Sequence, residues 1–292
     1  MNSQQKPHRR IALVTGGSKG IGLGIARALA SRNIDLLIIA RNTTDLEQAK
    51  ATLTKEFPKI EVHTMSADLS NASSYTQIVK FLKEHYGRLD IHVNNAGDFK
   101  QIPATNDSGP RDKPEELAAD IESLFKVNAV PPAIFAHVLQ PLLLNSDHPQ
   151  QLDVLSSAAV EIFSGNNPYG PTKVAHERIS LSTVADSNAR ICTYRVYPSN
   201  TDTRIVKQFN VPKLTPDLVG EEAVQMMLAD EGTDLYLKMT GQGLKRAQFT
   251  IDYCKFIRET EQGDVLVDGL ALVSEHRALV RAHFEPIIRA AH

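Results

Sequence analysis

The chain has 292 residues, 42% of them hydrophobic and 23% charged, with a formal net charge of −2. This is the composition of an ordinary globular protein, long enough for one large α/β domain with a substantial core. The small net charge gives no reason to expect nucleic acid as a partner. The two cysteines are too few for a disulfide framework, and the ten histidines show no metal-ligand spacing. Without a signal-peptide core or a membrane-spanning apolar run, we expect a cytoplasmic protein that binds neither a metal nor a membrane.

Strands and helices are predicted to alternate through the first two hundred residues. The apolar run 11–15 ends in a glycine-rich turn, and helical periodicity and a second apolar run, 34–40, complete a βαβ unit. Glycines at such a turn let the backbone approach a phosphate, to which the helix N-terminus offers free N–H groups. Further strands are expected at 60–65, 89–93, 152–156 and 190–197, and further helices at 46–57, 75–82, 115–127 and 168–186. This alternation predicts a doubly wound parallel sheet, a Rossmann fold.

The last ninety residues are harder to assign. Pro216 is expected to begin a helix that reaches about Leu228, and residues 274–291 read as a C-terminal helix. Two segments compete for the last strand, 234–239 and 264–267. Our division of the chain is an N-terminal tail at 1–8, one Rossmann-type domain at 9–270 with substrate-side segments at 98–113 and 204–262, and a C-terminal helical extension at 271–292.

Tyr169 and Lys173 lie four residues apart, so on one helix they share a face. A positive charge beside a phenol favours its anion and lowers its pKa from about 10. Such a tyrosine can exchange a proton near neutral pH, as a general acid or base must. This spacing is common on ordinary helices and gains weight only from other motifs. Pro171 between the two residues is tolerated if it lies in the first turn of the helix, and deeper it would kink the helix.

Three further motifs accompany this pair in a fixed order. Thr15-Gly16-x-x-x-Gly20-x-Gly22 forms the first turn, Asn94-Asn95-Ala96-Gly97 ends the fourth strand, and residues 198–203 follow the sixth strand. Together these motifs resemble the short-chain dehydrogenase/reductase family in its single-domain form, over roughly residues 9–203. Ser199 departs from the family pattern, which usually has a glycine there. Residues 263–269 look like the family's last strand, so we prefer 264–267 over 234–239.

The resemblance implies a catalytic tetrad of Asn128, a serine, Tyr169 and Lys173. Two serines compete for the second place, because Ser157 lies 12 residues before Tyr169 and Ser156 lies 13 before it. We favour Ser157, the last serine before Ala158, and keep Ser156 as its structural neighbour.

The same motifs predict a nicotinamide cofactor. Arg41 ends the second strand, where a site that prefers NAD would place an acid, and an arginine can pair with the 2′-phosphate of NADP. Lys19 adds a second positive charge, so we expect NADPH/NADP+. The residues assigned to the cofactor are Thr15, Gly16, Ser18, Lys19, Gly20, Ile21, Gly22, Arg41, Asn42, Asp68, Leu69, Asn95, Ala96, Gly97, Tyr169, Lys173, Pro198 and Thr203.

The resemblance therefore implies an NADPH-dependent oxidoreductase that reduces a small-molecule carbonyl to a secondary alcohol, with Tyr169 as proton donor. The serine would orient the carbonyl oxygen, Lys173 would lower the tyrosine pKa and hold the ribose, and Asn128 would position a water. The substrate pocket is expected at residues 98–113, 158–168 and 204–215, and a 3-oxoacyl group on a carrier protein, a free ketone and a polyketide-type intermediate all remain open as substrates. A non-catalytic NADP(H)-binding regulator is the alternative from another class. The resemblance also implies a homodimer or homotetramer.

Overall fold

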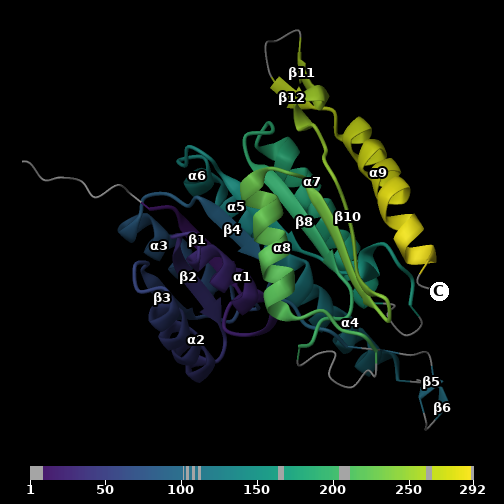
Figure 1. Cartoon of the computed structure of the whole chain (residues 1–292), viewed down its shortest axis with the longest axis horizontal. Coiled ribbons are helices and arrows are strands. Elements are labelled where there is room, and N and C mark those ends of the chain that lie inside the picture. The colour runs from purple at the N-terminus through teal and green to yellow at the C-terminus, as the bar shows by residue number, and fades with distance from the viewer. Residues whose placement is uncertain are drawn as a thin grey trace, which may run out of the picture.

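The computed structural model describes residues 9–100, 102, 105–106, 109–110, 113–163, 168–203, 211–260 and 265–290. Its main feature is an eight-stranded sheet of order β10-β9-β8-β7-β4-β1-β2-β3 (Figure 1). Every neighbouring pair is parallel except β9 with β10, which is antiparallel, so the predicted parallel sheet is confirmed. The strands are β1 (Ile11–Thr15), β2 (Asp35–Ala40), β3 (Val62–Ser66), β4 (Ile91–Asn94), β7 (Gln150–Val154), β8 (Cys192–Pro198), β9 (Asp234–Thr240) and β10 (Gly243–Phe249).

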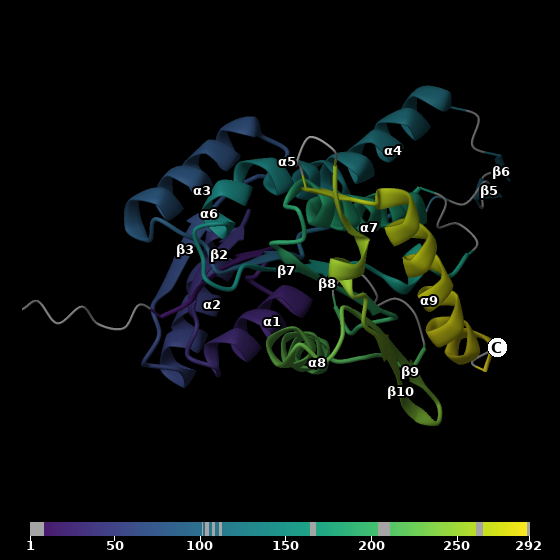
Figure 2. The ribbon, with the colours of Figure 1, turned by 90° about the horizontal axis from the view of Figure 1, so that it is seen from above.

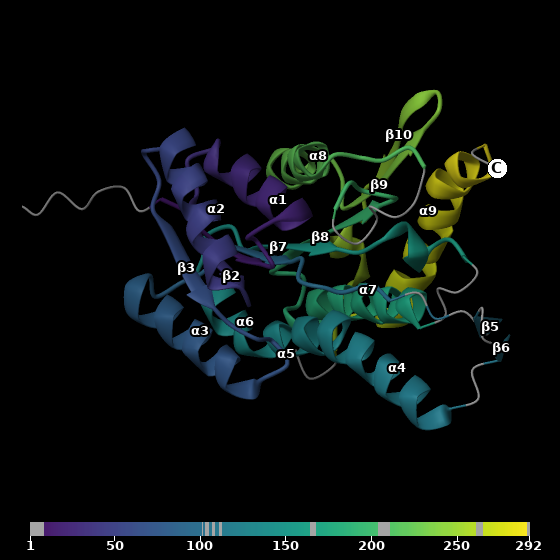
Figure 3. The same ribbon diagram turned by 90° about the horizontal axis from the view of Figure 1, so that it is seen from below.

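Helices cover both faces of this sheet, as Figures 2 and 3 show. One face is covered by α1 (Gly20–Ala30), α2 (Thr43–Glu56) and α8 (Pro216–Ala229). The other is covered by α3 (Ala72–His85), α4 (Pro114–Asn128), α5 (Val130–Val138), α6 (Gln140–Leu143) and α7 (Tyr169–Asp186). Consecutive residues of β1 point to opposite cores, with Ala12 and Val14 in one and Ile11 and Leu13 in the other. Both faces of the strand are thus buried, which explains its unbroken apolar sequence.

The last parallel strand of the central sheet is β9, so the preference for residues 264–267 was wrong. β9 pairs with β8 and turns back into β10, which the sequence analysis did not predict. Val265–Val267 instead forms β12, which pairs with β11 (Ile257–Glu259) in a separate two-stranded sheet. The reason is burial, because the first four residues of β9 are buried whereas Leu266 of β12 is 56% exposed.

Prolines lie near the starts of two helices without interrupting them. Pro131 and Pro132 lie in the first turn of α5, where a missing N–H costs no helical hydrogen bond. Pro171 lies in the first turn of α7 for the same reason, and the helix continues unbroken to Asp186. Within 98–113, the described residues include two short paired strands, β5 (Thr105–Asn106) and β6 (Gly109–Pro110).

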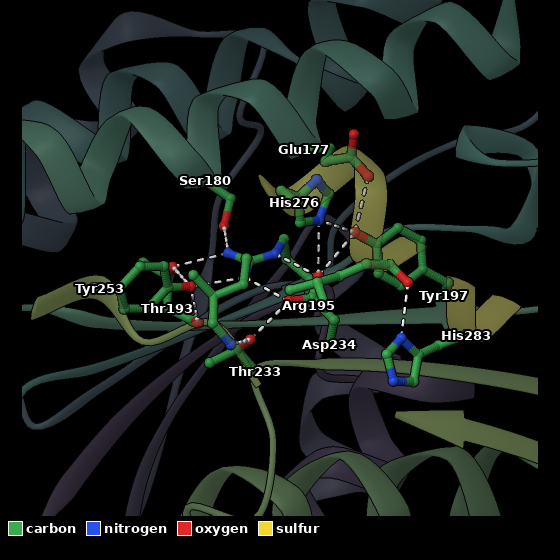
Figure 4. Close-up of polar contacts among 12 residues, drawn as sticks. Glu177, Ser180, Thr193, Arg195, Tyr197, Thr233, Asp234, Tyr253, His276 and His283 are labelled. Atoms are coloured by element: carbon green, nitrogen blue, oxygen red, sulfur yellow. Dashed lines mark hydrogen bonds and ion pairs between the residues drawn. The ribbon is translucent and has the colours of Figure 1, made fainter. Parts of the chain in front are cut away.

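The C-terminal helix α9 (Gly269–Arg289) lies over β10 and beside α7 (Figure 1). A fully buried ion pair between Arg195 of β8 and Asp234 of β9 lies beneath it, with two hydrogen bonds of 2.7 Å (Figure 4). His276 of α9 lies 3.1 Å from the same carboxylate, and the Tyr197 hydroxyl joins it to Glu177 of α7. Buried polar contacts therefore fix α9 to the sheet. No helix in the described ranges is long and apolar enough to cross a membrane.

Candidate active site

A cavity of about 900 Å³ opens at the carboxyl ends of β1, β2, β4, β7 and β8. This edge is where parallel α/β sheets bind ligands, because the connecting turns there leave a crevice. Of the residues predicted for the site, Thr15 and Asn128 are absent from the cavity lining. The remainder line it: Gly16, Ser18, Lys19, Gly20, Ile21, Gly22, Arg41, Asn42, Asp68, Leu69, Asn95, Ala96, Gly97, Ser157, Tyr169, Lys173, Pro198 and Thr203.

Thr15 holds the glycine turn against the end of β4. Its hydroxyl donates to the carbonyl of Val93 at 3.0 Å and accepts from the N–H groups of Asn95 (2.8 Å) and Ala96 (2.9 Å). The Asn95 amide in turn donates to the Thr15 carbonyl at 2.8 Å. Both polar side chains are thus occupied in shaping the turn.

The glycines of this turn leave its surface free of side chains. Gly16 and Gly20 have φ of +64° and +58°, in the left-handed region that favours glycine. A Cβ on Gly22 would overlap the carbonyl oxygen of Gly16 and the amide of Asn95, so no larger residue fits there. Gly20, Ile21 and Gly22 begin α1 and line the cavity, and the N-cap residue Lys19 gives the helix no side-chain cap. The arrangement is that of an anion site at a helix N-terminus.

The charges at the β2 end of the cavity differ from the sequence expectation. Arg41 and Lys19 both line the cavity, as predicted, but the Lys19 ammonium forms an ion pair of 2.6 Å with Asp45 of α2. The sequence shows no acid at the end of the second strand, so no carboxylate was expected near Arg41 and Lys19. Asp45, which belongs to α2, nevertheless lines this part of the cavity. Asp68 also lines it, and its pKa is lowered by hydrogen bonds from Ser70 and by the charge of Arg41.

Tyr169 begins α7 and stands edge-on to Phe99, with ring centroids 4.9 Å apart. Burial raises the pKa of its phenol, a hydrogen bond with Ser156 lowers that pKa, and the charge of Asp98 raises it. The expectation that Lys173 lowers the Tyr169 pKa was therefore wrong, because the net shift of this pKa is upward. The Lys173 ammonium lies 6.0 Å from the centre of the phenol ring, and burial has the largest effect on the phenol pKa. The phenol keeps its proton at neutral pH, the state that a proton donor requires.

The two serines after β7 have different surroundings. Ser156 is partly exposed to the cavity, its hydroxyl oxygen accepts from the N–H of Ala158 at 3.2 Å, and it lowers the pKa of the Tyr169 phenol. Ser157 begins a short 3-10 turn, η1 (Ser157–Ala159), and is buried. Both serines line the cavity and Ser156 is the more exposed, so the choice between them stays a prediction. The offset of 13 residues to Tyr169 was the signal for Ser156.

Lys173 is buried one helical turn after Tyr169, and its ammonium donates to the carbonyl of Val154 at 3.1 Å. Burial lowers its pKa to about 8, against the charge of Asp153, which raises it.

Asn128 is fully buried at the end of α4, and both ends of its amide have protein partners. Its Oδ1 accepts from the N–H of Asp98 at 2.8 Å, and its Nδ2 donates to the Asp98 carbonyl at 2.9 Å and to the Thr172 hydroxyl at 3.0 Å. This side chain therefore fixes the turn after β4 to helix α7.

Asp45 lines the cavity and was missed by sequence reasoning. Asp98 and Phe99 line it as well, and they lie in the segment 98–113 that was predicted to line the substrate pocket. Parts of the predicted pocket lie outside the described residues, namely 101, 103–104, 107–108, 111–112, 164–167 and 204–210. In the described part of the chain, no group of three or more His, Cys, Asp or Glu side chains could hold a metal ion.

Comparison with known proteins places this geometry in context. Human 3-keto-steroid reductase/17-beta-hydroxysteroid dehydrogenase 7 is 29% identical over 206 residues, 60% of this chain and 60% of that protein. The (+)-neomenthol dehydrogenase of Arabidopsis thaliana is 33% identical over 164 residues, 51% of this chain and 54% of that protein. The chain thus spans little more than half the length of these curated relatives. An alcohol dehydrogenase structure from the archaeon Thermococcus sibiricus, complexed with 5-hydroxy-NADP, matches with a TM-score of 0.64 and 24% identity, over 76% of this chain and 91% of that one.

A family model described as "short chain dehydrogenase" matches residues 10–213. The matched part contains the glycine turn, the turn after β4 and the segment with Tyr169 and Lys173, and it covers most of the chain. The chain therefore belongs to the short-chain dehydrogenase family.

Proposed function

We propose that this protein is an oxidoreductase that uses NADPH to reduce a small-molecule carbonyl to a secondary alcohol. The observation that supports this most strongly is the meeting of Tyr169, Ser156 and Lys173 at one end of a cavity whose other end is the glycine turn. The residues present suit a dinucleotide, because the side-chain-free glycine surface and the uncapped start of α1 suit its phosphates. When bound, the nicotinamide supplies the hydride.

The protein's own groups supply the proton and the orientation. The Tyr169 phenol, protonated because burial raises its pKa, donates a proton to the carbonyl oxygen. The Ser156 hydroxyl, which lines the same cavity as that phenol, donates a hydrogen bond to the same oxygen and orients it. Lys173 supplies a positive charge that favours the phenolate formed in the reaction. Asn128, whose amide joins the Asp98 backbone to α7, keeps these groups in register, and it positions the water that resupplies the proton.

The preference for NADPH over NADH rests on Arg41, since Asp45 engages Lys19. A guanidinium can pair with the 2′-phosphate through two hydrogen bonds, and no acid occupies the end of β2. We expect Arg41→Asp to invert the cofactor preference, because it adds repulsion as well as removing attraction. Lys19→Ala should have the smaller effect. Dissociation constants for NADPH and NADH, from nucleotide fluorescence, check both variants, and equal wild-type affinity for the two nucleotides would contradict the assignment.

The substrate is proposed to have an apolar skeleton. Phe99 lies against Tyr169, and Ile162 and Phe163 follow the η1 turn with exposed side chains. The human relative is named for a keto-steroid and the Arabidopsis relative for a menthol, both largely hydrocarbon molecules. A 3-oxoacyl group on a carrier protein is the alternative.

A homodimer or homotetramer is the proposed assembly, since Val130 of α5 and Val174 of α7 are exposed on the helical face beside α4. Light scattering at micromolar concentration tests it, with a monomer as the contrary result.

The test of the activity is NADPH oxidation across a panel of ketones and aldehydes, from short-chain to terpenoid, steroid and 3-oxoacyl compounds. The proposal expects turnover on at least one class, with apolar cyclic ketones preferred. Tight NADPH binding without turnover on any member would favour the alternative of a cofactor-binding regulator.

A further inference from the structure

A carboxylate lies inside the sheet, directly behind the proposed active site. Asp153 lies on β7, a central strand between β4 and β8, and its side chain is fully buried. Its Oδ1 accepts from the Asn94 amide at 2.8 Å and lies 3.0 Å from Nε2 of His176, and its Oδ2 accepts from the Gln151 amide at 2.9 Å. Burial raises the pKa of this carboxyl, but the hydrogen bonds with the His176 and Gln151 side chains lower it by more. The group is ionised, and burial of an ion is costly unless charge or hydrogen bonds compensate it.

The chain brings this carboxylate and Lys173 to the same buried region. Asp153 precedes Val154, whose carbonyl accepts a hydrogen bond of 3.1 Å from the Lys173 ammonium. On the facing helix, His176 lies three residues after Lys173 and therefore on the same side of α7. Two adjacent residues of β7 thus contact one turn of α7. The Val154 carbonyl accepts from Lys173, and the Asp153 carboxylate contacts His176. Burial lowers the pKa of Lys173, and the negative charge of Asp153 raises it.

The charge of Asp153 is available to Lys173 only if His176 does not neutralise it. Burial lowers the pKa of the His176 imidazole, and the charge of Lys173 lowers it further, while Asp153 raises it. The Nδ1 atom of His176 is buried and has no hydrogen-bond partner among the described residues. His92 of β4, near the same carboxylate, is also held neutral, because burial lowers its pKa to about 4. Asp98, another carboxylate in the cavity lining, raises the pKa of the Tyr169 phenol by its charge.

We propose that Asp153, paired with a neutral His176, is the buried counter-charge that keeps Lys173 cationic, and so acts as a positioning residue for the proton donor Tyr169. The catalytic consequence rests on the function proposed above, whereas the coupling of charge between Asp153 and Lys173 does not. At neutral pH the pair has a net negative charge because only the carboxylate is ionised. Without this charge, burial alone would act on Lys173, which would lose its proton at a lower pH.

Asp153→Asn tests this coupling, because it removes the charge and keeps the size of the side chain. His176→Gln is the matched control, since it removes the imidazole from the same contact and leaves the carboxylate in place. The readout is the titration of the Lys173 side chain by nuclear magnetic resonance, in protein labelled with carbon-13 at the lysine ε-carbon, with Lys173→Met to assign the signal. This measurement needs no substrate and no turnover, so it stands even if the proposed activity fails.

The expected result is that Asp153→Asn lowers the Lys173 titration midpoint by about one pH unit or more, the size of shift that an opposite charge within a few ångströms produces. His176→Gln should leave the midpoint nearly unchanged. With an active substrate in hand, the loss of kcat at high pH should move to lower pH in Asp153→Asn alone. A purely structural pair would lower stability in both variants and move neither titration.

Two outcomes would overturn the proposal. One is that the titration midpoint of Lys173 in the Asp153→Asn variant equals that of the wild-type protein. The other is a protonated His176 at neutral pH in the wild type, because an imidazolium would cancel the carboxylate charge. The second is read from the imidazole nitrogen shifts of the wild-type protein, so it remains decisive if Asp153→Asn does not fold.

Discussion

Ser156 and Ser157 are adjacent in sequence but differ in what their side chains touch. Ser156 is partly exposed to the cavity and lowers the pKa of the Tyr169 phenol, while Ser157 is buried at the start of η1. Ser156→Ala should lower kcat/KM by about 10²-fold, the usual cost of one donor to a developing oxyanion. Ser157→Ala, the matched control, should cost less than about tenfold and act mainly through stability. Steady-state kinetics and thermal unfolding of both variants check this, and the reverse order of kinetic effects would restore Ser157 to the catalytic position.

Buried Lys173 is expected to lower the unfolding free energy of the protein at neutral pH. Its pKa of about 8 in the folded protein lies below the ordinary value of 10.5, so the folded state binds this proton less well than the unfolded chain. The unfolding free energy contributed by this group is therefore lowest below pH 8 and rises as the pH goes from about 8 to about 10.5. Lys173→Met should be more stable than the wild type at neutral pH, with the difference shrinking towards high pH. Urea unfolding of the cofactor-free proteins at several pH values measures it, and a variant less stable at neutral pH would contradict the burial argument.

At the scale of elements, local pattern predicted most of the fold. The parallel strands, the glycine turn and α7 follow from apolar runs and from turn residues that act on their immediate neighbours. The segment that forms β9 was one of two candidates and was set aside because residues 263–269 resemble the family's last strand. Among the described residues, the strand Val265–Val267 pairs with β11. β9 begins with a charge, Asp234, which is buried against Arg195 of β8. Local spacing could not reveal this, since both outcomes depend on pairing between distant segments.

The site shows the same division between local and non-local information. Motif spacing identified Tyr169 and Lys173 and the residues of the glycine turn, all of which line the cavity except Thr15. It did not identify Asp45 as the partner of Lys19, because that ion pair joins the start of α1 to the start of α2. The polar residues of β7 and the histidine one turn after Lys173 were visible in the sequence as exceptions to an apolar pattern. Only the fold shows that they meet.

The buried ion pair that joins β8 to β9 should dominate the stability of the C-terminal elements. Arg195→Met leaves Asp234 buried without its guanidinium, and breaking such a pair from one side costs about 3–5 kcal/mol of unfolding free energy. Arg246→Met is the matched control, because Arg246 forms a partly exposed ion pair with Glu222 of α8, and exposed pairs contribute about 0–1 kcal/mol. Urea unfolding compares the two variants, and equal losses would mean that the Arg195 pair contributes no more than a surface pair.

At the scale of the whole molecule, the chain divides into a cavity side and a supporting side. The cavity lies at the carboxyl ends of the parallel strands, whereas α9 packs on β10 and α7 and does not line it. Ser180 of α7 bonds with Arg195 at 3.3 Å, so the network under α9 continues into the helix that begins with Tyr169 (Figure 4). The C-terminal elements are thus expected to support the position of α7, and the chemistry to depend on the opposite end of that helix.

The central claim is that Tyr169 gives the proton in an NADPH-dependent carbonyl reduction. Tyr169→Phe removes one hydroxyl from a ring that stays packed edge-on against Phe99, so the fold and the NADPH dissociation constant should be preserved. Turnover of the best ketone of the panel should fall by about 10²–10⁴-fold, the usual contribution of a positioned proton donor. The decisive measurement is kcat for this variant against the wild type across pH, beside the NADPH dissociation constant of each. A large loss of kcat with unchanged NADPH binding is the predicted result, and near-wild-type kcat with an unchanged pH profile would contradict the account.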